Sequence, residues 1–339
     1  MKKTTIWLNT HLNCIAPIRQ ADVAREFRFV TSYRSRKYQA DALLADLFEL
    51  EPSLLDAAYV DYALEFVQRH GVDVFFPGRK MVEIARRRDE FTALGVKVVL
   101  AGDADALDIL KDKGRFYDAL VADSVPVPRY IVARNAEEFA AAVATLQQEM
   151  PVVCFKPTVG IFGQGFKILL TDENAHLLVD VDRHLLTTLN IALGELSTGE
   201  HFRRQIVLAY LPGVERSVDC LADNGRLLRA IVRYKLADGS RVLERNRQVE
   251  EHARRLTERF RLSGLFNAQF KDHLGMPYVL EINARMSGGI AMACLSGVAL
   301  PYWALRVAMG TCTEADIPLP KTGLRVAEVT QAVVLGKAE

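Results

Sequence analysis

Three polar residues alternate with apolar ones in the last quarter of the sequence and are followed by a glycine pair. In YVLEINARMSGG, Glu281, Asn283 and Arg285 occupy every second position. Alternate side chains of a β-strand share one face, so we expect a carboxylate, a carboxamide and a guanidinium side by side. Carboxylate and amide oxygens suit Mg²⁺, and the planar guanidinium suits a phosphoryl group. The pattern predicts a cation and phosphate site; a solvent-facing strand of a half-exposed sheet is the alternative.

A preceding strand supplies a further oxygen ligand. The segment FNAQFKDHLGMPYVLEINAR is typical of a β-hairpin that turns around Gly275. If the turn has an odd number of residues, Gln269 shares the face of Glu281 and Asn283, and the three side chains converge their oxygens. One carboxylate with two amide oxygens fits a Mg²⁺ site that a nucleoside triphosphate completes.

A glycine-rich segment earlier in the chain predicts a phosphate-binding loop. In FKPTVGIFGQGFKIL, Lys156 ends a predicted strand, and Gly160, Gly163 and Gly165 precede another. The segment lacks the Gly-Lys-Ser/Thr ending and the following helix of a P-loop. A glycine loop between two strands can instead fold over a nucleotide, with backbone N–H groups facing its phosphates and Lys156 as a fixed positive charge. A mobile surface hairpin is the alternative.

Strands and helices alternate over the first hundred residues. TTIWLN, FRFVTSY, VDVFFPG and VKVVLAG are predicted strands, and LLDAAYVDYALEFVQRHG and KMVEIARRRDEFTALG are predicted helices. This alternation predicts a parallel sheet flanked by helices. His11 and Asn13 follow the first strand, at the sheet edge where α/β proteins bind ligands, although a structural role is favoured for both.

The pattern of predicted helices and strands changes near residue 104. Two helical pieces, a helix AEEFAAAVATLQQE and the glycine-rich strand pair come first, and residues 203–339 are then rich in strands. Short turns such as ADNG and HLGMP predict hairpins and an antiparallel sheet. One long helix, RQVEEHARRLTERFRL, interrupts these strands.

Composition excludes several classes of function. The 339 residues are 25% charged with a net charge of +1, which gives no support for a nucleic-acid partner. The five cysteines form no Cys-x-x-Cys pair, which argues against a zinc knuckle or disulfide framework and favours a reducing compartment. No apolar run approaches the roughly 20 residues of a membrane span, and the N-terminus is unlike a signal peptide. We therefore expect a soluble, cytoplasmic protein that does not associate with membranes.

Over roughly residues 104–310, these segments together resemble the ATP-grasp superfamily. In that family a lysine at a helix start, a lysine before the glycine loop, a hinge strand, a ribose-binding glutamate and a Glu-x-Asn-x-Arg strand follow one another. The matching residues here are Lys113 in KDKGRF, Lys156 in CFKP, the hinge VLAYLPG, Glu215 in GVERSVD, and Glu281, Asn283 and Arg285.

The resemblance implies ATP and Mg²⁺ as cofactors, with Mn²⁺ as a substitute for Mg²⁺. Lys113, Lys156 and the loop glycines Gly160, Gly163 and Gly165 would contact the phosphates, and Glu215 would accept the ribose hydroxyls. Gln269, Glu281 and Asn283 would hold two metal ions, with glutamine as the variant found in the carbamoyl phosphate synthetase large subunit. Lys156 and Arg285 would act on the transferring phosphoryl group.

The hinge departs from the family pattern. Many members carry a glutamate where Leu208 and Ala209 stand here. The family reads adenine largely through backbone groups, so the Ala209 carbonyl and the Leu211 N–H are the expected contacts. A side-chain contact to the adenine amine is not expected.

The resemblance also implies the fold class, which combines α/β and α+β. Residues 1–103 would form a parallel α/β pre-ATP-grasp domain, and a two-lobed ATP-grasp fold would follow. Its small lobe with the glycine-rich loop would cover residues 104–200, and its C-terminal lobe with the metal and substrate site would cover residues 201–339. The chain ends without an extra lobe, so we expect an open pocket or one closed by a second subunit of a homodimer.

The segment ARMSGG resembles carboxylate–amine ligases, in which the glycine pair lines the substrate pocket. The implied activity is ATP-dependent joining of a small acid or amino acid to an amine through an acyl phosphate. Two alternatives are phosphorylation of bicarbonate or carbamate, as in carbamoyl phosphate synthetase, and a non-catalytic ATP-binding regulator. Candidates for gripping a substrate carboxylate are Arg233, Lys235, Arg241 and Arg245.

Overall fold

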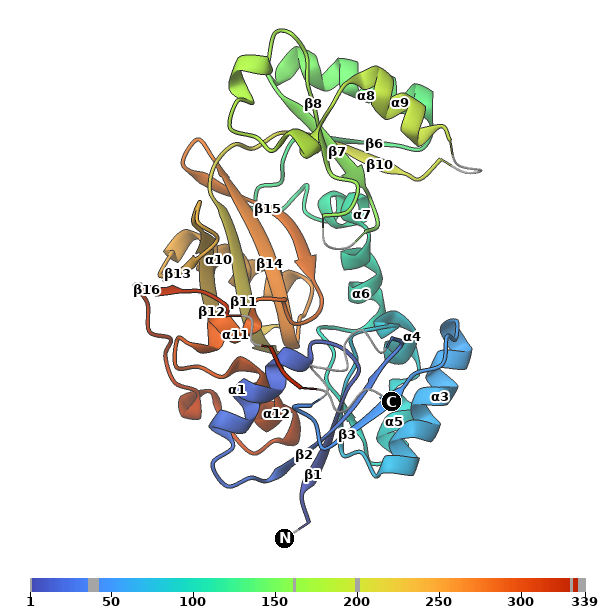
Figure 1. Ribbon diagram of the computed structural model, residues 1–339, viewed down its shortest axis with the longest axis vertical. Coiled ribbons are helices and arrows are strands. Elements are labelled where there is room, and N and C mark those ends of the chain that lie inside the picture. Colours follow the sequence, from blue (N-terminus) through green and yellow to red (C-terminus); the bar gives the residue numbers. More distant parts are fainter. Residues whose placement is uncertain (1, 36–42, 161–162, 199–201, 330–331, 335–339) are drawn as a thin grey trace. The chain divides into compact units, whose positions relative to one another are not determined.

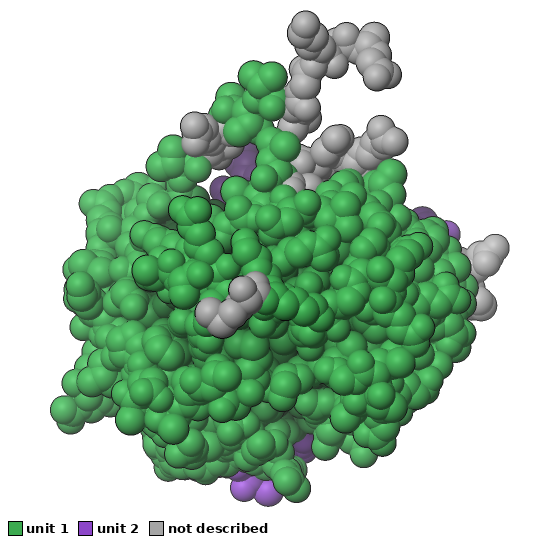
Figure 2. All heavy atoms as spheres, turned by 90° about the horizontal axis from the view of Figure 1, so that it is seen from below, with its two compact units in different colours: residues 1–108, 215–269, 282–339 green, residues 109–214, 270–281 purple. Residues whose placement is uncertain are grey.

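The computed structural model describes residues 2–35, 43–160, 163–198, 202–329 and 332–334. The chain forms two compact units, each assembled from separated stretches of sequence (Figure 2). Unit 1 comprises residues 1–108, 215–269 and 282–339, and unit 2 comprises residues 109–214 and 270–281. The predicted three-part division at residues 103 and 200 remains a prediction.

Unit 1 contains a parallel five-stranded sheet, sheet A, with strand order β3-β2-β1-β4-β5. The central strand β1 is fully buried at Ile6, Trp7 and Leu8. Helices α3 and α5 lie on one side of the sheet, and α1 and α12 lie on the other (Figure 1). The sheet strands are β1 (Thr4–Leu8), β2 (Phe27–Tyr33), β3 (Leu47–Leu50), β4 (Val74–Phe76) and β5 (Lys97–Val98), and the helices are α1 (Ile15–Ala21), α3 (Asp56–His70), α4 (Met81–Arg86) and α5 (Arg88–Ala93). The predicted parallel sheet is confirmed.

Two details of this region differ from the sequence-based prediction. The single helix expected after β4 is broken into α4 and α5 at Arg87, whose backbone leaves the helical region at φ −113° and ψ 23°. The Arg87 guanidinium donates to Asp61 and Glu90. Strand β3 was not expected, because this edge strand is only half-buried and has no strong apolar alternation.

A second sheet, sheet C, has the order β15-β14-β11-β12-β13-β16, and its β11, β12, β13 and β16 pair antiparallel. One apolar core in unit 1 includes Leu8 of sheet A, Leu221 and Ile231 of sheet C, and Leu305. The strands are β11 (Glu215–Asp223), β12 (Arg226–Lys235), β13 (Arg241–Glu244), β14 (Gly264–His273), β15 (Met276–Asn283) and β16 (Leu324–Val326), and the helices are α10 (Arg247–Arg259), α11 (Ile290–Cys294) and α12 (Leu300–Met309).

Unit 2 contains sheet B, with the order β6-β10-β7-β8-β9 and mostly antiparallel pairing. Helices α8 and α9 cover one face of this sheet (Figure 1), and Phe139 of α8 packs edge-on against Phe155. The elements are α7 (Lys113–Asp118), β6 (Tyr130–Ala133), α8 (Ala136–Glu149), β7 (Val153–Pro157), β8 (Lys167–Leu169), β9 (Leu186–Thr187), α9 (Leu189–Leu196) and β10 (Gln205–Ala209), preceded by α6 (Ala104–Lys111), which begins in unit 1.

Short 3₁₀ turns complete the described elements. They are η1 (Leu12–Cys14), η3 (Ala175–Leu177), η4 (Arg183–Leu185) and η5 (Glu314–Asp316). Within the part of the chain that the structure describes, no helix combines the length and the apolar character needed to cross a bilayer.

Candidate functional site

Two lysines converge on one carboxylate in unit 2. The Lys113 Nζ lies 3.2 Å from Oε2 of Glu281, and the Lys156 Nζ lies 3.8 Å from the same oxygen. The three side chains are 9%, 13% and 20% exposed, respectively. Two ammonium groups thus face one carboxylate in a shielded place. Such a cluster can attract a polyphosphate, because ammonium–phosphate hydrogen bonds are strong where water is scarce.

The start of α7 fixes the position of Lys113. Asp112 is the N-cap, and its Oδ1 accepts hydrogen bonds from the backbone N–H groups of Gly114 and Arg115 at 2.9 and 3.2 Å. The backbone N–H of Lys113 donates to the carbonyl of Thr158 at 2.9 Å, and its Nζ donates to the carbonyl of Gly160 at 3.2 Å. The first residue of α7 is therefore held against the segment that leaves β7.

Asp112 also carries an ion pair that sequence reasoning missed. Its Oδ2 accepts from the guanidinium of Arg204 and from the hydroxyl of Thr158. The backbone N–H of Thr158 donates to the carbonyl of Arg204 at 3.0 Å. An aspartate directly before a predicted helix start is an N-cap signal, so the capping role of Asp112 was predictable from the sequence. Its ion pair with Arg204, which is 92 positions away, was not.

The glycine-rich segment joins two antiparallel strands, as the sequence predicts. Lys156 lies in β7 opposite Ile206 of β10, and β7 pairs with β8. Gly163 and Gly165 have φ values of 67° and 75°, a region in which glycine is favoured. Residues 161 and 162 lie outside the described residues. The contact of Gly160, Gly163 and Gly165 with phosphates remains a prediction.

The hinge and the ribose-binding candidate lie at opposite ends of a short connection. Leu208, Ala209 and Leu211 have buried apolar side chains, and the backbone groups of Ala209 and Leu211 remain the predicted contacts to adenine. The Ala209 N–H donates to the carbonyl of Arg129 at 2.9 Å, and the contact of the Ala209 carbonyl with adenine remains a prediction. Glu215 is exposed at the first position of β11.

The turn of the metal hairpin does not meet the condition of an odd number of residues. Only Leu274 and Gly275 separate β14 from β15, both with positive φ values, in the two-residue form that suits a tight hairpin. Turn length alone therefore does not place Gln269 on the face of Glu281 and Asn283. Gln269 and Asn283 are both half-buried and remain predicted metal ligands.

The donor set nevertheless fits Mg²⁺ held jointly with a nucleotide. Among the described residues, no three His, Cys, Asp or Glu side chains gather into a metal site. A cation at Glu281 would thus rely on amide, phosphate and water oxygens. Mg²⁺ is usually bound in this way, by one or two carboxylates with substrate phosphates supplying much of the rest.

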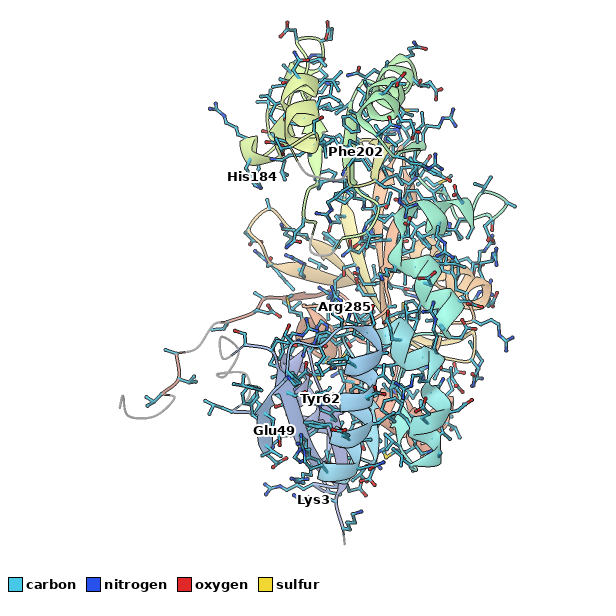
Figure 3. All side chains as sticks on the ribbon, turned by 90° about the vertical axis from the view of Figure 1, so that its right-hand side faces the viewer. Lys3, Glu49, Tyr62, His184, Phe202 and Arg285 are labelled. Atoms are coloured by element: carbon cyan, nitrogen blue, oxygen red, sulfur yellow. The ribbon has the colours of Figure 1, made fainter. Side chains whose placement is uncertain are left out.

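Arg285 lies at the carboxyl edge of sheet A, within unit 1. A small cavity of about 20 Å³ is bordered by Thr10 and His11 after β1, Pro77 after β4, and Arg285 and Met286. Figure 3 shows Arg285 beyond the end of sheet A that lies opposite Lys3, the residue before β1. Strand β1 lies between β2 and β4, and this is the topological switch point at which open α/β sheets bind ligands.

His11 is a neutral, conformationally unusual residue at this edge. Its backbone is left-handed, with φ 55°, which is uncommon for any residue with a side chain. Burial, and next the charge of Arg285, lower its pKa from 6.5 to about 3. The neighbouring Asn13 donates to the carbonyl of Gly288 at 3.0 Å. His11 and Asn13 thus contribute to the structure around Arg285, in line with the structural role that the sequence analysis favours for both.

Comparisons with known proteins show which family and which solved structures the chain resembles. Residues 201–332 match the family described as "ATP-grasp in the biosynthetic pathway with Ter operon". The biotin carboxylase–β,γ-ATP complex from Campylobacter jejuni has a TM-score of 0.68 at 13% identity, covering 94% of this chain and 74% of that one. The N5-carboxyaminoimidazole synthetase from Staphylococcus aureus, complexed with ADP, has a TM-score of 0.66 at 14% identity, covering 94% and 81%. The C-terminal part of the chain thus matches an ATP-grasp family, the chain has the fold of these solved structures, and the predicted fold class is confirmed.

The chain is also similar in sequence to large chains of carbamoyl phosphate synthases. The chain is 25% identical over 301 residues to the carbamoyl phosphate synthase arginine-specific large chain of Geobacillus stearothermophilus, covering 84% of this chain and 26% of that one. It is 24% identical over 262 residues to the carbamoyl phosphate synthase large chain of Pasteurella multocida, covering 73% and 23%. The chain therefore spans about a quarter of the length of these curated relatives.

Proposed function

We propose that the chain is an ATP-dependent, ADP-forming ligase that joins a small carboxylic acid or amino acid to an amine. The observation that carries this proposal is the convergence of Lys113 and Lys156 on Glu281, with pairs at 3.2 and 3.8 Å. A carboxylate that orders two ammonium groups is suited to binding a triphosphate and its counter-cation together.

Each predicted residue has a place in this proposal. Lys113, Lys156 and the backbone of the glycine loop hold the phosphates, Glu215 holds the ribose, and the backbone at Ala209 and Leu211 reads adenine. Gln269, Glu281 and Asn283 would hold Mg²⁺, with Mn²⁺ as a substitute. A bound divalent cation would neutralise phosphate charge during the transfer.

The reaction would proceed through an acyl phosphate. A carboxylate oxygen of the acid attacks the γ-phosphorus of ATP, the bond to the bridging oxygen breaks, and ADP leaves. The amine nitrogen then attacks the acyl carbon, inorganic phosphate leaves, and the nitrogen loses a proton. In the first step the protein chiefly positions the reactants and offsets their negative charge, which is the proposed role of Lys156 and Arg285.

A second candidate is phosphorylation of bicarbonate or carbamate. The similarity to carbamoyl phosphate synthase large chains favours it, as does the likeness to a Hydrogenobacter thermophilus biotin carboxylase domain dimer described with MgADP and bicarbonate. That structure has a TM-score of 0.65 at 16% identity, covering 91% of this chain and 70% of that one. It also motivates a homodimer as part of the proposal. The family description supports a biosynthetic role, and the five free thiols support a cytoplasmic location.

Measurement of ADP release tests these alternatives. The purified chain is incubated with Mg-ATP and with pools of acids, amino acids and amines, and separately with bicarbonate. ADP release that needs both an acid and an amine supports the ligase, whereas release with bicarbonate alone supports the second candidate. If the chain binds nucleotide but releases no ADP with any pool, both proposed activities are contradicted, and a non-catalytic ATP-binding regulator is the remaining alternative.

A matched pair of variants links the activity to the site. Glu281→Gln removes the carboxylate, so we expect release of ADP to stop. The loss of the shared partner of Lys113 and Lys156 should also lower the melting temperature, so release is measured well below it, where circular dichroism shows that the variant is folded. Glu137→Gln changes an exposed glutamate of α8 in the same unit and should leave release unchanged. Full activity of Glu281→Gln at ordinary Mg²⁺ concentration would contradict the proposed site.

A further inference from the structure

Arg233 of β12 is a buried arginine with most of its hydrogen bonds satisfied inside unit 1. Its side chain is 4% exposed, and its Nε donates to Oδ2 of Asp219 at 2.8 Å. Its Nη2 donates to the hydroxyls of Ser217 and Ser287 at 3.1 and 3.0 Å. A guanidinium that already donates these hydrogen bonds is unsuited to binding a substrate carboxylate, the role for which the sequence made Arg233 a candidate.

The negative partner of Arg233 is also fully engaged. Asp219 is 1% exposed, and its Oδ1 accepts from Nδ2 of Asn267 at 2.9 Å. Asn267 donates to the hydroxyl of Ser217 as well, again at 2.9 Å. A buried ion pair is costly unless its lone pairs and protons are satisfied in this way, and satisfied networks hold one geometry rigidly.

The glycine at position 289 is explained by the same guanidinium. A Cβ added to Gly289 would lie 2.4 Å from Nη1 and 2.9 Å from Cζ of Arg233. Any larger residue would displace the arginine from its partners. The backbone at Gly289 therefore lies close to the guanidinium, and the hydroxyl of Ser287, two residues earlier, accepts a hydrogen bond from it.

The same turn is held from its other side. The side chain of Asn13, in the 3₁₀ turn after β1, donates to the carbonyl of Gly288 at 3.0 Å. Residues 287–289 are thus fixed by two elements from different sheets, β12 of sheet C and the connection after β1 of sheet A. Arg285 lies two residues before this turn and donates from Nη1 to the carbonyl of Met286 at 3.0 Å.

We propose that Arg233 is a positioning residue that holds the turn Ser287–Gly289, and through it the guanidinium of Arg285, in the orientation that phosphoryl transfer needs. The proposal rests on the proposed function for its catalytic consequence only. Arg233 acts through the backbone that carries Arg285 and does not contact the substrate. Asp219 and Asn267 keep its guanidinium in place, and Gly289 leaves room for it.

Backbone hydrogen exchange of residues 284–290 tests the positioning without any assay of activity. Arg233→Met removes the hydrogen bonds but keeps much of the side-chain volume, and Arg233→Lys keeps the charge but not the fork geometry. We expect exchange of this segment to become about tenfold faster in Arg233→Met, with a smaller change in Arg233→Lys. The control Arg226→Lys changes an arginine of the same strand that is 65% exposed, and should leave exchange unchanged.

Kinetics then separate positioning from substrate contact. We expect the kcat for ADP release to fall by about 100-fold in Arg233→Met, the cost of a misplacement of roughly 1 Å, with little change in either KM. A raised KM for the acid with unchanged exchange would overturn the proposal in favour of direct contact. If wild type releases no ADP with any substrate, the proposed function fails, and the exchange measurement still decides whether Arg233 holds the turn.

A double-mutant cycle covers the case in which Arg233→Met fails to fold. Gly289→Ala should speed exchange of the same segment in the wild-type background because its Cβ displaces the guanidinium. In an Arg233→Lys background the effect of Gly289→Ala should be much smaller, since the group it displaces is gone. Equal effects in both backgrounds would show that Gly289 and Arg233 are independent and would overturn the proposal.

Discussion

The ammonium group of Lys113 lies 3.2 Å from a carboxylate oxygen of Glu281, so the first residue of α7 is paired with β15 inside unit 2. The hydroxyl of Tyr117, on the same helix, donates to the carbonyl of Leu280 at 2.9 Å and fixes the adjacent backbone. A second ammonium, from Lys156, lies 3.8 Å from the same carboxylate oxygen. Helix α7, β7 and β15 thus bring together three charges that are far apart in the sequence.

Replacing Lys113 by methionine should weaken ATP binding by about 10- to 100-fold. The reason is the loss of one charge-assisted hydrogen bond to phosphate, worth roughly 1.5–3 kcal/mol. Titration calorimetry with a non-hydrolysable ATP analogue measures the change. Lys111→Met is the matched control, because Lys111 lies two residues away and is exposed. Equal affinities of the two variants would remove Lys113 from the phosphate site.

Asp112 should be important for the stability of the protein. Asp112→Ala removes the N-cap of α7 and the partner of Arg204, so we expect a loss of about 1–3 kcal/mol in the free energy of unfolding. Asp112→Asn keeps a capping side chain and should recover part of that loss, but not the ion pair. Urea unfolding followed by circular dichroism measures both. No difference between the two variants would show that the cap contributes nothing beyond the ion pair.

The sheets were predictable because their signals are local. Alternating buried strands and amphipathic helices gave the parallel sheet, and the C-terminal end of α3 at Gly71 follows from a left-handed φ of 58° that glycine adopts easily. The break at Arg87 was not predictable, since the residues of α4 and α5 favour one continuous helix. At the break, Arg87 pairs with Asp61 of α3, a contact between two elements that the sequence does not reveal.

The candidate site was only partly readable from the sequence. The order of Lys113, Lys156 and Glu281 matches the family, and the structure brings these three residues together. The burial of Arg233 was not readable, because its partner Asp219 is 14 positions away and a basic strand residue is usually exposed. The turn between β14 and β15 depends on φ values at Leu274 and Gly275 that the sequence does not fix.

Glu51 should be a strong determinant of the stability of unit 1. Its side chain is fully buried and accepts from the hydroxyls of Ser32 at 2.7 Å and Tyr59 at 3.1 Å, and it pairs with Arg79 at 2.5 Å. Glu51→Gln leaves the Arg79 charge largely uncompensated, so we expect a loss of about 3–5 kcal/mol in the free energy of unfolding.

Thermal and urea unfolding of Glu51→Gln measure this loss. The control Glu49→Gln removes a carboxylate from β3 that is 31% exposed and pairs with Arg69 and His70, and it should cost about 1 kcal/mol or less. If the two variants lose similar amounts of unfolding free energy, the burial of Glu51 and its pair with Arg79 does not contribute more to stability than an exposed ion pair does.

His11 should make the stability of the protein depend on pH below neutrality. Its pKa is about 3 in the folded protein and 6.5 ordinarily, chiefly because burial disfavours the imidazolium, with Arg285 adding repulsion. Between these values the unfolded state binds more protons, so the contribution of His11 to stability is present above pH 6.5 and is lost as the pH falls toward 3. The slope from this group is at most about 1.4 kcal/mol per pH unit.

The His11→Asn variant isolates this dependence. Asparagine tolerates the left-handed backbone at φ 55° and does not titrate, so its free energy of unfolding should fall less than that of wild type between pH 7 and pH 5. His176→Asn changes an exposed histidine and should keep the wild-type slope. Urea midpoints at each pH measure the slopes. Equal slopes for His11→Asn and wild type would mean that His11 takes up a proton in the folded protein as readily as in the unfolded chain, and that burial beside Arg285 does not keep it neutral.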